Sequence, residues 1–475
     1  MVEINYQKAI EESKVLLNNW KRQCLTPFGK VTIIKTFIVS KFNHLFISLP
    51  NPSLEMVKSI SDIMYKFLWT GKPDKVNRQQ ICQDYSDGGL KMINIKKFIK
   101  SLKLTWIIHL ISDTDSQWAY LINSDLSLSS KLRNFGSAWI ETAKIGNHFW
   151  EDVLNSWHYF FQSCPIQNGQ DILFSPLWHN KNISKIPLFY PTWHKKGITF
   201  VRDLVNENGR FYSMTELKKL YQLSNINALE YFRVKLLTKA LMNKIKPGEI
   251  NYQENGPVLP SQLKIFYKSK KGATDMYKIM NKAVVKSKMK VKWYELINQE
   301  INHSVWRNIF RVCFRFSYDT SLTWFQYRLI YRIIGVRKYL LMIGKDDSSV
   351  CRICTHEEET ITHLFFYCKQ STDLWKSISN WLKSKLGIVI NFDIKEIIFG
   401  HLQKELNYDV INLLIMCTKK YIFQSAVNYK KLNVYNFQTR FKSIFYEHLT
   451  LLKLRETNEK RIHKWTAWEP LFDDI

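Results

Sequence analysis

The sequence has little glycine, proline and cysteine for its length. Its 475 residues include 16 Gly, 12 Pro and 8 Cys. These contents exclude a collagen-like chain, a low-complexity linker and a secreted scaffold held together by disulfides. An uninterrupted apolar run of 18 residues is also missing. The closest stretch, residues 31–49, contains Lys35 and Lys41, so it is predicted to be a core helix and not a membrane span.

Acidic residues are few compared with basic ones. The 69 Lys and Arg against 41 Asp and Glu give a net charge of +28. Such an excess is typical of proteins that bind a polyanion, either nucleic acid or an anionic membrane face. The sequence contains no amphipathic membrane anchor and no apolar signal region, so we expect no membrane partner and an intracellular location, in nucleus or cytoplasm.

Aromatic residues, in contrast, are abundant, with 16 Trp, 23 Tyr and 29 Phe. Apolar residues recur at helical spacing through most of the chain, which predicts a mainly α fold with minor β content. In the first stretch we expect helices over residues 6–22, from about Lys30, over 54–69 and over 95–110. The helix from about Lys30 is expected to bury Ile33, Ile34, Phe37, Ile38 and Phe42.

The sharpest local pattern is a group of three cysteines and one histidine. Cys351 and Cys354 enclose two residues, His363 follows after eight more, and Cys368 after four. Two thiolates at the first spacing form a tight knuckle whose backbone amides donate to the sulfurs, and Zn²⁺ takes three sulfurs and one imidazole nitrogen tetrahedrally. Four protein ligands leave no open position, so the predicted zinc is structural. His356 is the alternative third ligand, disfavoured because it follows Cys354 too closely.

The role of this predicted zinc knuckle toward nucleic acid stays open. Glu357, Glu358 and Glu359 lie between the second cysteine and the histidine, and their charges are expected to repel phosphate. A purely structural staple and a nucleic-acid contact therefore remain alternatives.

Glycine and proline spacing, together with these patterns, divides the chain into five segments. Gly256, Pro257 and Pro260 mark a boundary before a lysine-dense stretch. The middle of the chain is expected to be irregular, with tryptophans scattered among polar loops. The predicted segments are a helical unit at 1–110, a connecting region at 111–260, a basic helical region at 261–345, the zinc knuckle at 346–392 and a helical region at 393–475.

Basic residues concentrate in two further places. Ten lysines and one acid lie between Lys264 and Lys292. Spacing by four would place some of them on one helical face, whereas their alternation toward Lys292 fits an edge strand equally well. A second set interleaves arginines with tyrosines, as suits single-stranded or A-form RNA. The predicted contacts are Lys278, Lys282, Lys286, Lys290, Arg328 and Arg332, and a solvated surface without a partner is the alternative.

Carboxylates arranged for catalysis are missing from the sequence. Adjacent acids occur at Asp346–Asp347 and Asp473–Asp474, but neither pair has a third acid or apolar strand-forming flanks. Polymerases and nucleases hold divalent metal with such sets. We therefore predict that this chain is not itself an enzyme.

A series of short motifs extends over nearly the whole chain. They run from Trp20 to Lys30, Leu49 to Pro52, Phe67 to Trp69, Gly88 to Leu90, Lys196 to Ile198, Gly209 to Phe211, Phe325 to Tyr327 and Cys351 to Trp375. In this order they resemble the thumb, the connecting segment and the C-terminal zinc-knuckle segment of non-LTR (LINE-type) retrotransposon reverse transcriptases.

The resemblance implies a C-terminal part of such an enzyme, with the endonuclease and the catalytic palm expected before residue 1. It implies binding of RNA, of RNA–DNA hybrid or of DNA, and it makes a separately encoded palm a further expected partner. In that family the first unit packs against duplex, which assigns phosphate contacts to Lys30, Lys35, Lys72, Lys75 and Arg78. A host-adopted scaffold or protein-interaction module is the alternative function.

Overall fold

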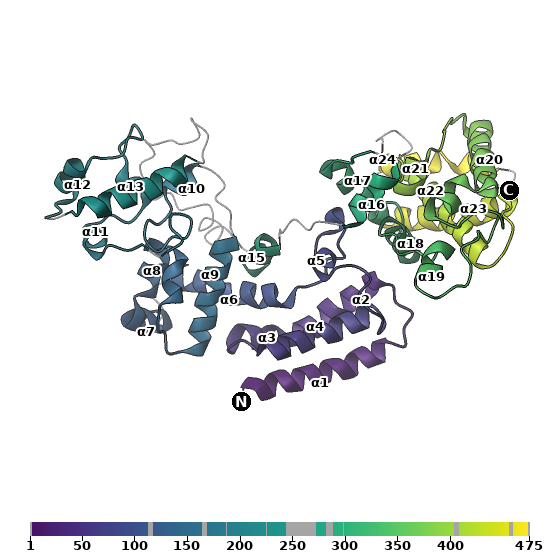
Figure 1. Ribbon diagram of the computed structural model, residues 1–475. Coiled ribbons are helices and arrows are strands. Elements are labelled where there is room, and N and C mark those ends of the chain that lie inside the picture. Colours follow the sequence, from purple (N-terminus) through teal and green to yellow (C-terminus); the bar gives the residue numbers. More distant parts are fainter. Residues whose placement is uncertain are drawn as a thin grey trace. The chain divides into compact units, whose positions relative to one another are not determined.

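The computed structural model describes residues 2–112, 117–163, 169–186, 188–224, 226–243, 272–281, 288–297, 299–402, 408–455 and 459–473. Within these residues the fold is mainly α, as predicted (Figure 1). The described residues contain no extended strand and only isolated β-bridges, at Pro176–Phe200, Val205–Phe211 and Val350–Glu358. No helix in this part of the chain is both long and apolar enough to cross a bilayer.

The contacts divide the chain into two compact units, each built from non-contiguous segments. The first unit comprises Met1–Leu16, Phe37–Ile63 and Ile93–Ala283, and the second comprises Leu17–Thr36, Met64–Met92 and Val284–Ile475. The predicted division of the sequence into five consecutive segments stays a prediction.

The first unit is built around helix α6. Its helices, counting those that lie mostly within it, are α1 (Val2–Trp20), α3 (Ser40–Ser48), α4 (Leu54–Leu68), α6 (Ile95–Ser112), α7 (Gln117–Leu126), α8 (Leu128–Asn134), η3 (Ser137–Glu141), α9 (His148–Ser163), α10 (Gly169–Leu173), α11 (Pro191–Lys195), η4 (Val201–Leu204), α12 (Met214–Tyr221), α13 (Ala228–Met242) and α15 (Gly272–Asn281). Helix α6 packs against α3, α9 and α15. Helix α1 is tied to α3 by Tyr6, whose hydroxyl donates to Leu45 O at 3.1 Å and whose ring stacks on Phe46.

The tryptophans of the middle region are core residues. Trp150 and Trp157 are buried with α6 and α15 in one hydrophobic core, and Trp178 and Trp193 are fully buried in another. The Trp178 indole N–H donates to Ile198 O at 2.7 Å, which satisfies its polar group inside that core. The expectation of tryptophans among polar loops was therefore wrong for Trp150, Trp157 and Trp193, which lie on helices, and Trp178, although in a turn, is buried in the core as well.

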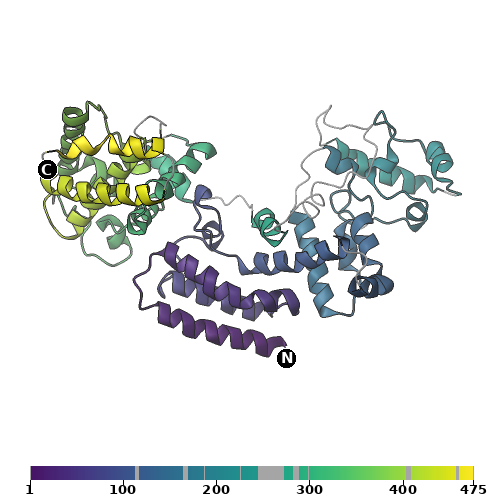
Figure 2. The same ribbon diagram turned by 180° about the vertical axis from the view of Figure 1, so that it is seen from behind.

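The second unit contains the remaining helices. They are α2 (Pro27–Ile33), η1 (Ile34–Val39), α5 (Arg78–Ile81), η2 (Tyr85–Asp87), α16 (Lys288–Ile297), α17 (His303–Arg315), α18 (Thr320–Ile330), α19 (Arg337–Met342), η5 (His363–Tyr367), α20 (Lys369–Leu386), α21 (Ile394–Phe399), α22 (Tyr408–Val427), α23 (Val434–Arg455), α24 (Glu459–Thr466) and η6 (Glu469–Phe472). Helices α23 and α24, in yellow, pack against each other (Figure 2). Gly88 links the early segments to α18, because its carbonyl accepts from the hydroxyls of Tyr327 and Tyr331. A Cβ at Gly88 would lie 2.6 Å from a ring carbon of Phe310, so no larger residue fits there.

The helix predicted from about Lys30 differs from expectation in one respect. It begins at Pro27, and residues Ile34–Val39 form a π-turn before α3 continues. Ile34 and Ile38 are fully buried as predicted, but Phe37 is 41% exposed. A π-turn adds a residue to the turn and shifts the buried face, which the assumption of regular 3.6-residue spacing could not foresee.

A buried lysine without a carboxylate partner lies at the centre of the second unit. Lys419 on α22 is fully buried, and its ammonium donates to Gln326 Oε1 at 2.6 Å and to Ile398 O at 3.2 Å. Burial lowers the pKa of Lys419 to about 7, against a small opposing effect of Cys313. The folded protein therefore binds this proton less tightly than the unfolded chain does.

This difference predicts that stability rises with pH. Above about pH 7 the folded protein loses the Lys419 proton while the unfolded chain keeps it until its ordinary pKa near 10.5, so the unfolding free energy gains up to about 1.4 kcal/mol per pH unit in that window. Substitution Lys419→Met should remove this slope in denaturant titrations at several pH values. Lys420→Met, at a neighbouring lysine paired with Asp319, is the control and should leave it. Identical slopes in both variants would contradict the prediction.

Candidate metal centre

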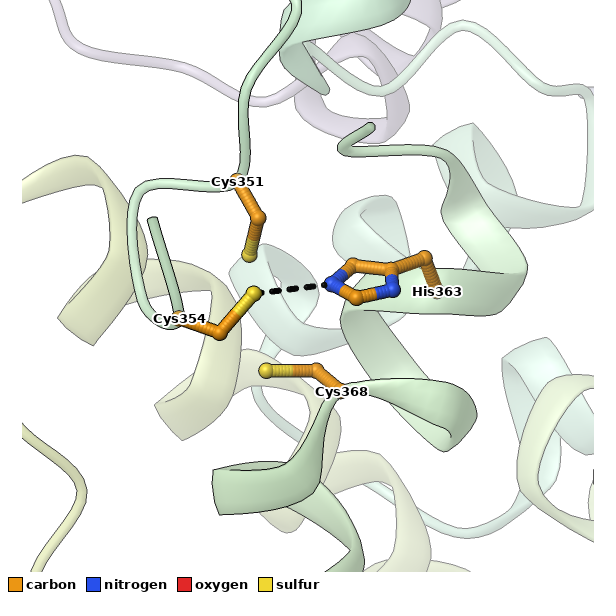
Figure 3. Close-up of side chains that lie close together, drawn as sticks. All are labelled: Cys351, Cys354, His363 and Cys368. Atoms are coloured by element: carbon orange, nitrogen blue, oxygen red, sulfur yellow. Dashed lines mark hydrogen bonds between the residues drawn. The ribbon is translucent and has the colours of Figure 1, made fainter. Parts of the chain in front are cut away.

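Three sulfurs and one imidazole nitrogen converge in the second unit (Figure 3). They belong to the four residues predicted from spacing, Cys351, Cys354, His363 and Cys368. Their ligand atoms all lie within 4.8 Å of one another, and Cys354 Sγ is 3.3 Å from His363 Nε2. Among the described residues, this zinc cluster is the one group of three or more Cys, His, Asp or Glu that could hold a metal ion.

The turn that carries the first two cysteines has the predicted form. The Cys351 N–H donates to Glu357 O at 2.7 Å, which closes the loop. The amides of Cys354 and Ile353 hydrogen-bond the Cys351 sulfur and lower its pKa, although the hydrogen bond with Cys368 and burial outweigh them and raise the pKa overall. Backbone amides therefore already point at a sulfur, as a zinc knuckle requires.

The other two ligands lie around the π-turn η5 and the beginning of helix α20. His363 opens the π-turn η5, and Cys368 lies immediately before α20. The hydrogen bond from Cys351 lowers the pKa of the Cys368 thiol, and the amides of Ser371 and Gln370 lower it further against the effect of burial. This environment favours a thiolate at Cys368, which is the form that binds metal.

The donor set fits Zn²⁺. Ligand atoms bound tetrahedrally at about 2.0–2.3 Å from one zinc lie roughly 3.5–3.8 Å apart, so the observed cluster needs only a small contraction. Four protein ligands leave no open position for a water nucleophile. The centre is therefore structural, and its chemistry is to hold the chain together.

The histidine in the cluster is His363, as preferred from the sequence. His356 is exposed, and its Nδ1 faces the carbonyl of Cys354 instead of the sulfurs. His363 turns Nε2 toward the sulfurs, while its Nδ1 lies 2.9 Å from Glu357 Oε2 without the alignment of a hydrogen bond. A carboxylate beside the second ring nitrogen is the usual means of orienting a zinc-bound histidine.

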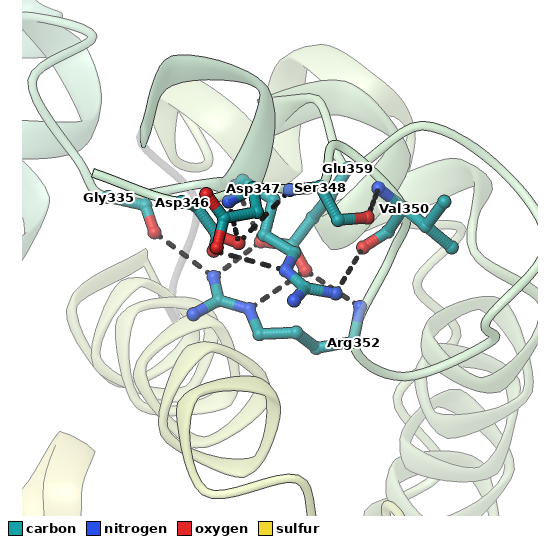
Figure 4. A network of polar contacts seen from close by, with 8 residues as sticks. Gly335, Asp346, Asp347, Ser348, Val350, Arg352 and Glu359 are labelled. Carbon is teal, nitrogen blue, oxygen red and sulfur yellow. Dashed lines mark hydrogen bonds and ion pairs between the residues drawn. The ribbon is translucent and has the colours of Figure 1, made fainter. Parts of the chain in front are cut away.

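A buried ion pair fixes the zinc cluster to the neighbouring helix (Figure 4). The side chains of Arg352 and Glu359 are 6% and 0% exposed. Arg352 donates to Glu359 from its backbone N–H at 2.9 Å, from Nε at 3.0 Å and from Nη2, and Nη2 also donates to Gly335 O at 3.0 Å. The Arg337 N–H, at the start of α19, donates to the same carboxylate at 3.0 Å. Nearly all the polar atoms of the pair are thus satisfied inside the protein.

Two of the three loop glutamates are paired with basic side chains in the structure. Glu359 is buried against Arg352, Glu358 lies 2.7 Å from the Lys338 ammonium, and Glu357 faces His363. The pairing of Glu358 and Glu359 reduces the free negative charge of the loop, while Glu357 remains 70% exposed.

Comparison with known families agrees with this geometry. Residues 273–375 match the family described as zinc-binding in reverse transcriptase. All four ligands fall inside the matched range. The chain thus contains a segment that is similar to the zinc-binding segment of reverse transcriptases.

The predicted N-terminal basic residues belong to the same compact unit as the zinc ligands, but their side chains differ in exposure. Lys72 and Lys75, in the turn after α4, are exposed, and Lys35 is half-buried. Lys30 is only 9% exposed, and its ammonium donates to Thr70 Oγ1 at 2.7 Å. Burial lowers the pKa of both Lys30 and Lys35.

Arg78 has local partners that the sequence did not reveal. Its Nε donates to Asp74 Oδ2 at 2.7 Å, and its guanidinium lies 4.3 Å from the centre of the Tyr65 ring. Because the acid neutralises much of its charge, Arg78 offers less attraction to a phosphate than Lys72 or Lys75 does.

Of the four lysines predicted to share a helical face, two lie among the described residues, so the shared face stays a prediction. Lys278 lies on α15 in the first unit, Lys290 lies on α16 in the second, and Lys282 and Lys286 fall outside the described residues. Residues 288–297 are helical, so the edge-strand alternative is wrong for them. The Lys290 ammonium lies 5.5 Å from the centre of the Trp306 ring and is partly buried.

Arg328, on α18, and Arg332, just after its end, are both half-buried. Arg328 has a buried Nε without a hydrogen-bond partner among the described residues, and burial lowers its pKa. Arg332 donates from Nη1 to Lys292 O at 3.1 Å and stacks 5.0 Å from the Trp293 ring.

Sequence reasoning missed two exposed lysines that the fold adds to this basic surface. Lys345 is close enough to Lys75 to lower its pKa, together with burial, Arg328 and Lys72. Lys292 lies beside Arg332 at the turn after α18. No local signal could have joined them to Lys75, because both are more than 200 residues from it in sequence.

Proposed function

We propose that this chain is a nucleic-acid-binding part of a LINE-type reverse transcriptase. It binds RNA, RNA–DNA hybrid or DNA through the basic surface of its second unit, in the nucleus or cytoplasm, and works beside a separately supplied polymerase palm. The zinc centre supports that surface and takes no part in chemistry. The match at 273–375 and the net charge of +28 support this proposal.

The observation that carries the proposal is a cluster of like charges around Lys75. Burial lowers the pKa of Lys75, and the charges of Arg328, Lys72 and Lys345 lower it further. Like charges held together cost free energy in the unbound protein, and a polyanion that approaches them removes this cost. We call these four residues the Lys75 cluster.

A groove beside the Lys75 cluster adds aromatic surface. It has a volume of about 370 Å³, and its aromatic lining is the partly exposed Trp324, whose ring lies 6.2 Å from that of Trp69, which is only 4% exposed. Its described lining contains Lys30, Lys72 and Lys75 and no acidic residue. Lysines beside tryptophans suit nucleic acid, where ammonium groups meet phosphates and rings meet bases.

Charge reversal tests the proposal. The double variant Lys72→Glu, Lys75→Glu should weaken binding of an RNA–DNA hybrid evenly across sequences and flatten the dependence of log affinity on log salt by about two units, near one per lost phosphate contact. Adding Arg78→Glu should change the slope little more, because Arg78 is already paired with Asp74.

The control is Lys376→Glu with Lys383→Glu, two exposed lysines on α20 outside the groove lining. This variant carries the same charge change and should keep the wild-type slope. Equal slopes for the wild type and the Lys72, Lys75 variant, measured by titration at several salt concentrations, would remove this surface from the proposal.

One observation favours the alternative of a protein-interaction module. Helix α13 buries Tyr231, Val234 and Leu241 on one face but leaves Leu229, Phe232 and Leu236 exposed on the other, at 78%, 62% and 73%. Exposed apolar side chains at helical spacing are typical of protein contacts. A chain whose RNA affinity is negligible and independent of salt would support this alternative over nucleic-acid binding.

A further inference from the structure

A second and larger cleft opens next to the zinc-binding segment. Its volume is about 720 Å³, and all its lining residues belong to the second unit. It lies between the turn before α5, helices α16 and α19, the end of α18 and residues Thr360–Thr362, which immediately precede the zinc ligand His363. The cleft and the aromatic groove described above share one lining residue, Lys75.

The charge of this cleft is entirely of one sign. Its basic lining residues come from four separate elements, and the described lining contains no Asp or Glu. Glu358 pairs with one of them from outside the lining, and Glu295 lies near another. The basic lining residues are Lys75, Lys292, Arg332 and Lys338.

One of these residues adopts a conformation that its side chain does not favour. Arg332 has φ +55° at the end of α18, where its N–H donates to Leu329 O and the next N–H, of Ile333, donates to Arg328 O. Glycine is the usual residue at this left-handed position of a helix C-cap. Because glycine fits this backbone position, replacing Arg332 by glycine removes the guanidinium without straining the backbone. The stacking of the guanidinium on Trp293 and its hydrogen bond to Lys292 O hold the group at the cleft.

The remaining lining suits a base more than a simple anion. Tyr339 contributes partly exposed aromatic surface, Tyr331 is only 9% exposed, and Met342, which is 74% exposed, adds a flexible apolar side chain. A cleft of this volume accommodates a small ligand, or about one or two nucleotides of a strand, and is too small for a duplex. Lys75 belongs both to the cleft lining and to the Lys75 cluster, so positive charge extends from the cleft to that cluster. We therefore infer a ligand longer than a single nucleotide.

We propose that this cleft binds one single-stranded segment of nucleic acid, with its phosphates on Lys292 and Arg332 and a base against Tyr339. The inference rests on the proposed function and adds to it a site for a single strand, distinct from the groove with Trp69 and Trp324. Thr360–Thr362 place the strand beside the zinc-binding segment, which gives that segment a role in shaping the cleft.

Two variants test the cleft in the full-length, zinc-loaded chain. The probes are a short oligouridine, a short oligodeoxythymidine and a blunt RNA–DNA hybrid. Lys292→Glu and Arg332→Gly should each weaken binding of a single strand by about tenfold and lower its salt slope by about 0.7 per lost phosphate contact, with less than about a threefold effect on the hybrid. Lys376→Glu, with the same charge change as Lys292→Glu, should show no selective loss.

Arg332→Gly also separates binding from folding. Glycine suits the left-handed position better than arginine, so this variant should unfold at a denaturant concentration no lower than the wild type while it binds single strands less tightly. Loss of both stability and binding would assign Arg332 a structural role and overturn its assignment to the strand.

The remaining outcomes distinguish this inference from the proposed function. A wild-type chain that binds the hybrid but neither oligonucleotide overturns the cleft inference and leaves the proposed function standing. A chain that binds none of the three probes contradicts both. Equal losses for single strands and hybrid would show that the cleft is not selective for a strand. A preference between oligouridine and oligodeoxythymidine shows whether the strand is RNA or DNA.

Discussion

The double variant Cys351→Ser, Cys368→Ser is expected to contain no zinc and to lose the folded structure around the cluster. Structural zinc contributes about 10–16 kcal/mol in zinc-finger peptides, which equals or exceeds the whole stability of a typical domain. The cluster joins the knuckle to the start of α20, so its loss frees both elements. Elemental analysis should show one zinc per wild-type chain and none in the variant. Hydrogen exchange should show loss of amide protection in residues 351–371.

Two other cysteines provide a matched control. Cys313 and Cys417 are buried and lie outside the zinc cluster. Replacing both by serine also buries two hydroxyls but should leave one zinc per chain. Zinc that persists in the Cys351, Cys368 variant, or zinc that is absent from wild-type protein prepared without chelator, would contradict the assignment.

The second large effect is expected from Glu359→Gln. This change leaves the Arg352 guanidinium buried without a counter-charge and replaces one of the two oxygens, each of which accepts two hydrogen bonds, by an NH2 group that cannot accept. Breaking a buried ion pair from one side typically costs about 3–5 kcal/mol, because the remaining charge is uncompensated. Denaturant unfolding of the zinc-loaded protein, followed by a probe in the second unit, measures the loss.

Glu358→Gln is the control, one residue away in the same loop. Its pair with Lys338 is exposed on both sides, with side-chain exposures of 45% and 57%, so it should cost less than about 1 kcal/mol. The double variant Arg352→Met, Glu359→Leu should recover much of the stability lost in Glu359→Gln, because an apolar pair leaves no buried charge. Similar losses for Glu358→Gln and Glu359→Gln would show that burial of the pair is not what matters.

Local patterns in the sequence predicted much of the fold and the whole metal centre. The helices expected over residues 6–22, 54–69 and 95–110 are present as Val2–Trp20, Leu54–Leu68 and Ile95–Ser112. Helical periodicity is a property of neighbouring residues, so it can be read without knowing what packs against the helix. The zinc cluster was predictable for the same reason, because its four ligands lie within 18 consecutive residues and their spacing largely dictates the geometry.

Only the tertiary structure decided which charges are available and where they meet. In the sequence, Lys72 and Arg78 look equivalent. In the structure, Arg78 forms an ion pair with Asp74 and lies over the Tyr65 ring, whereas Lys72 is exposed. Lys419 looks like a surface lysine, yet it is fully buried. The basic cleft was invisible for a related reason. Its walls come from the turn before α5 and from helices more than 200 residues later, and electrostatic interactions depend on distance in space, which the order of residues along the chain does not give.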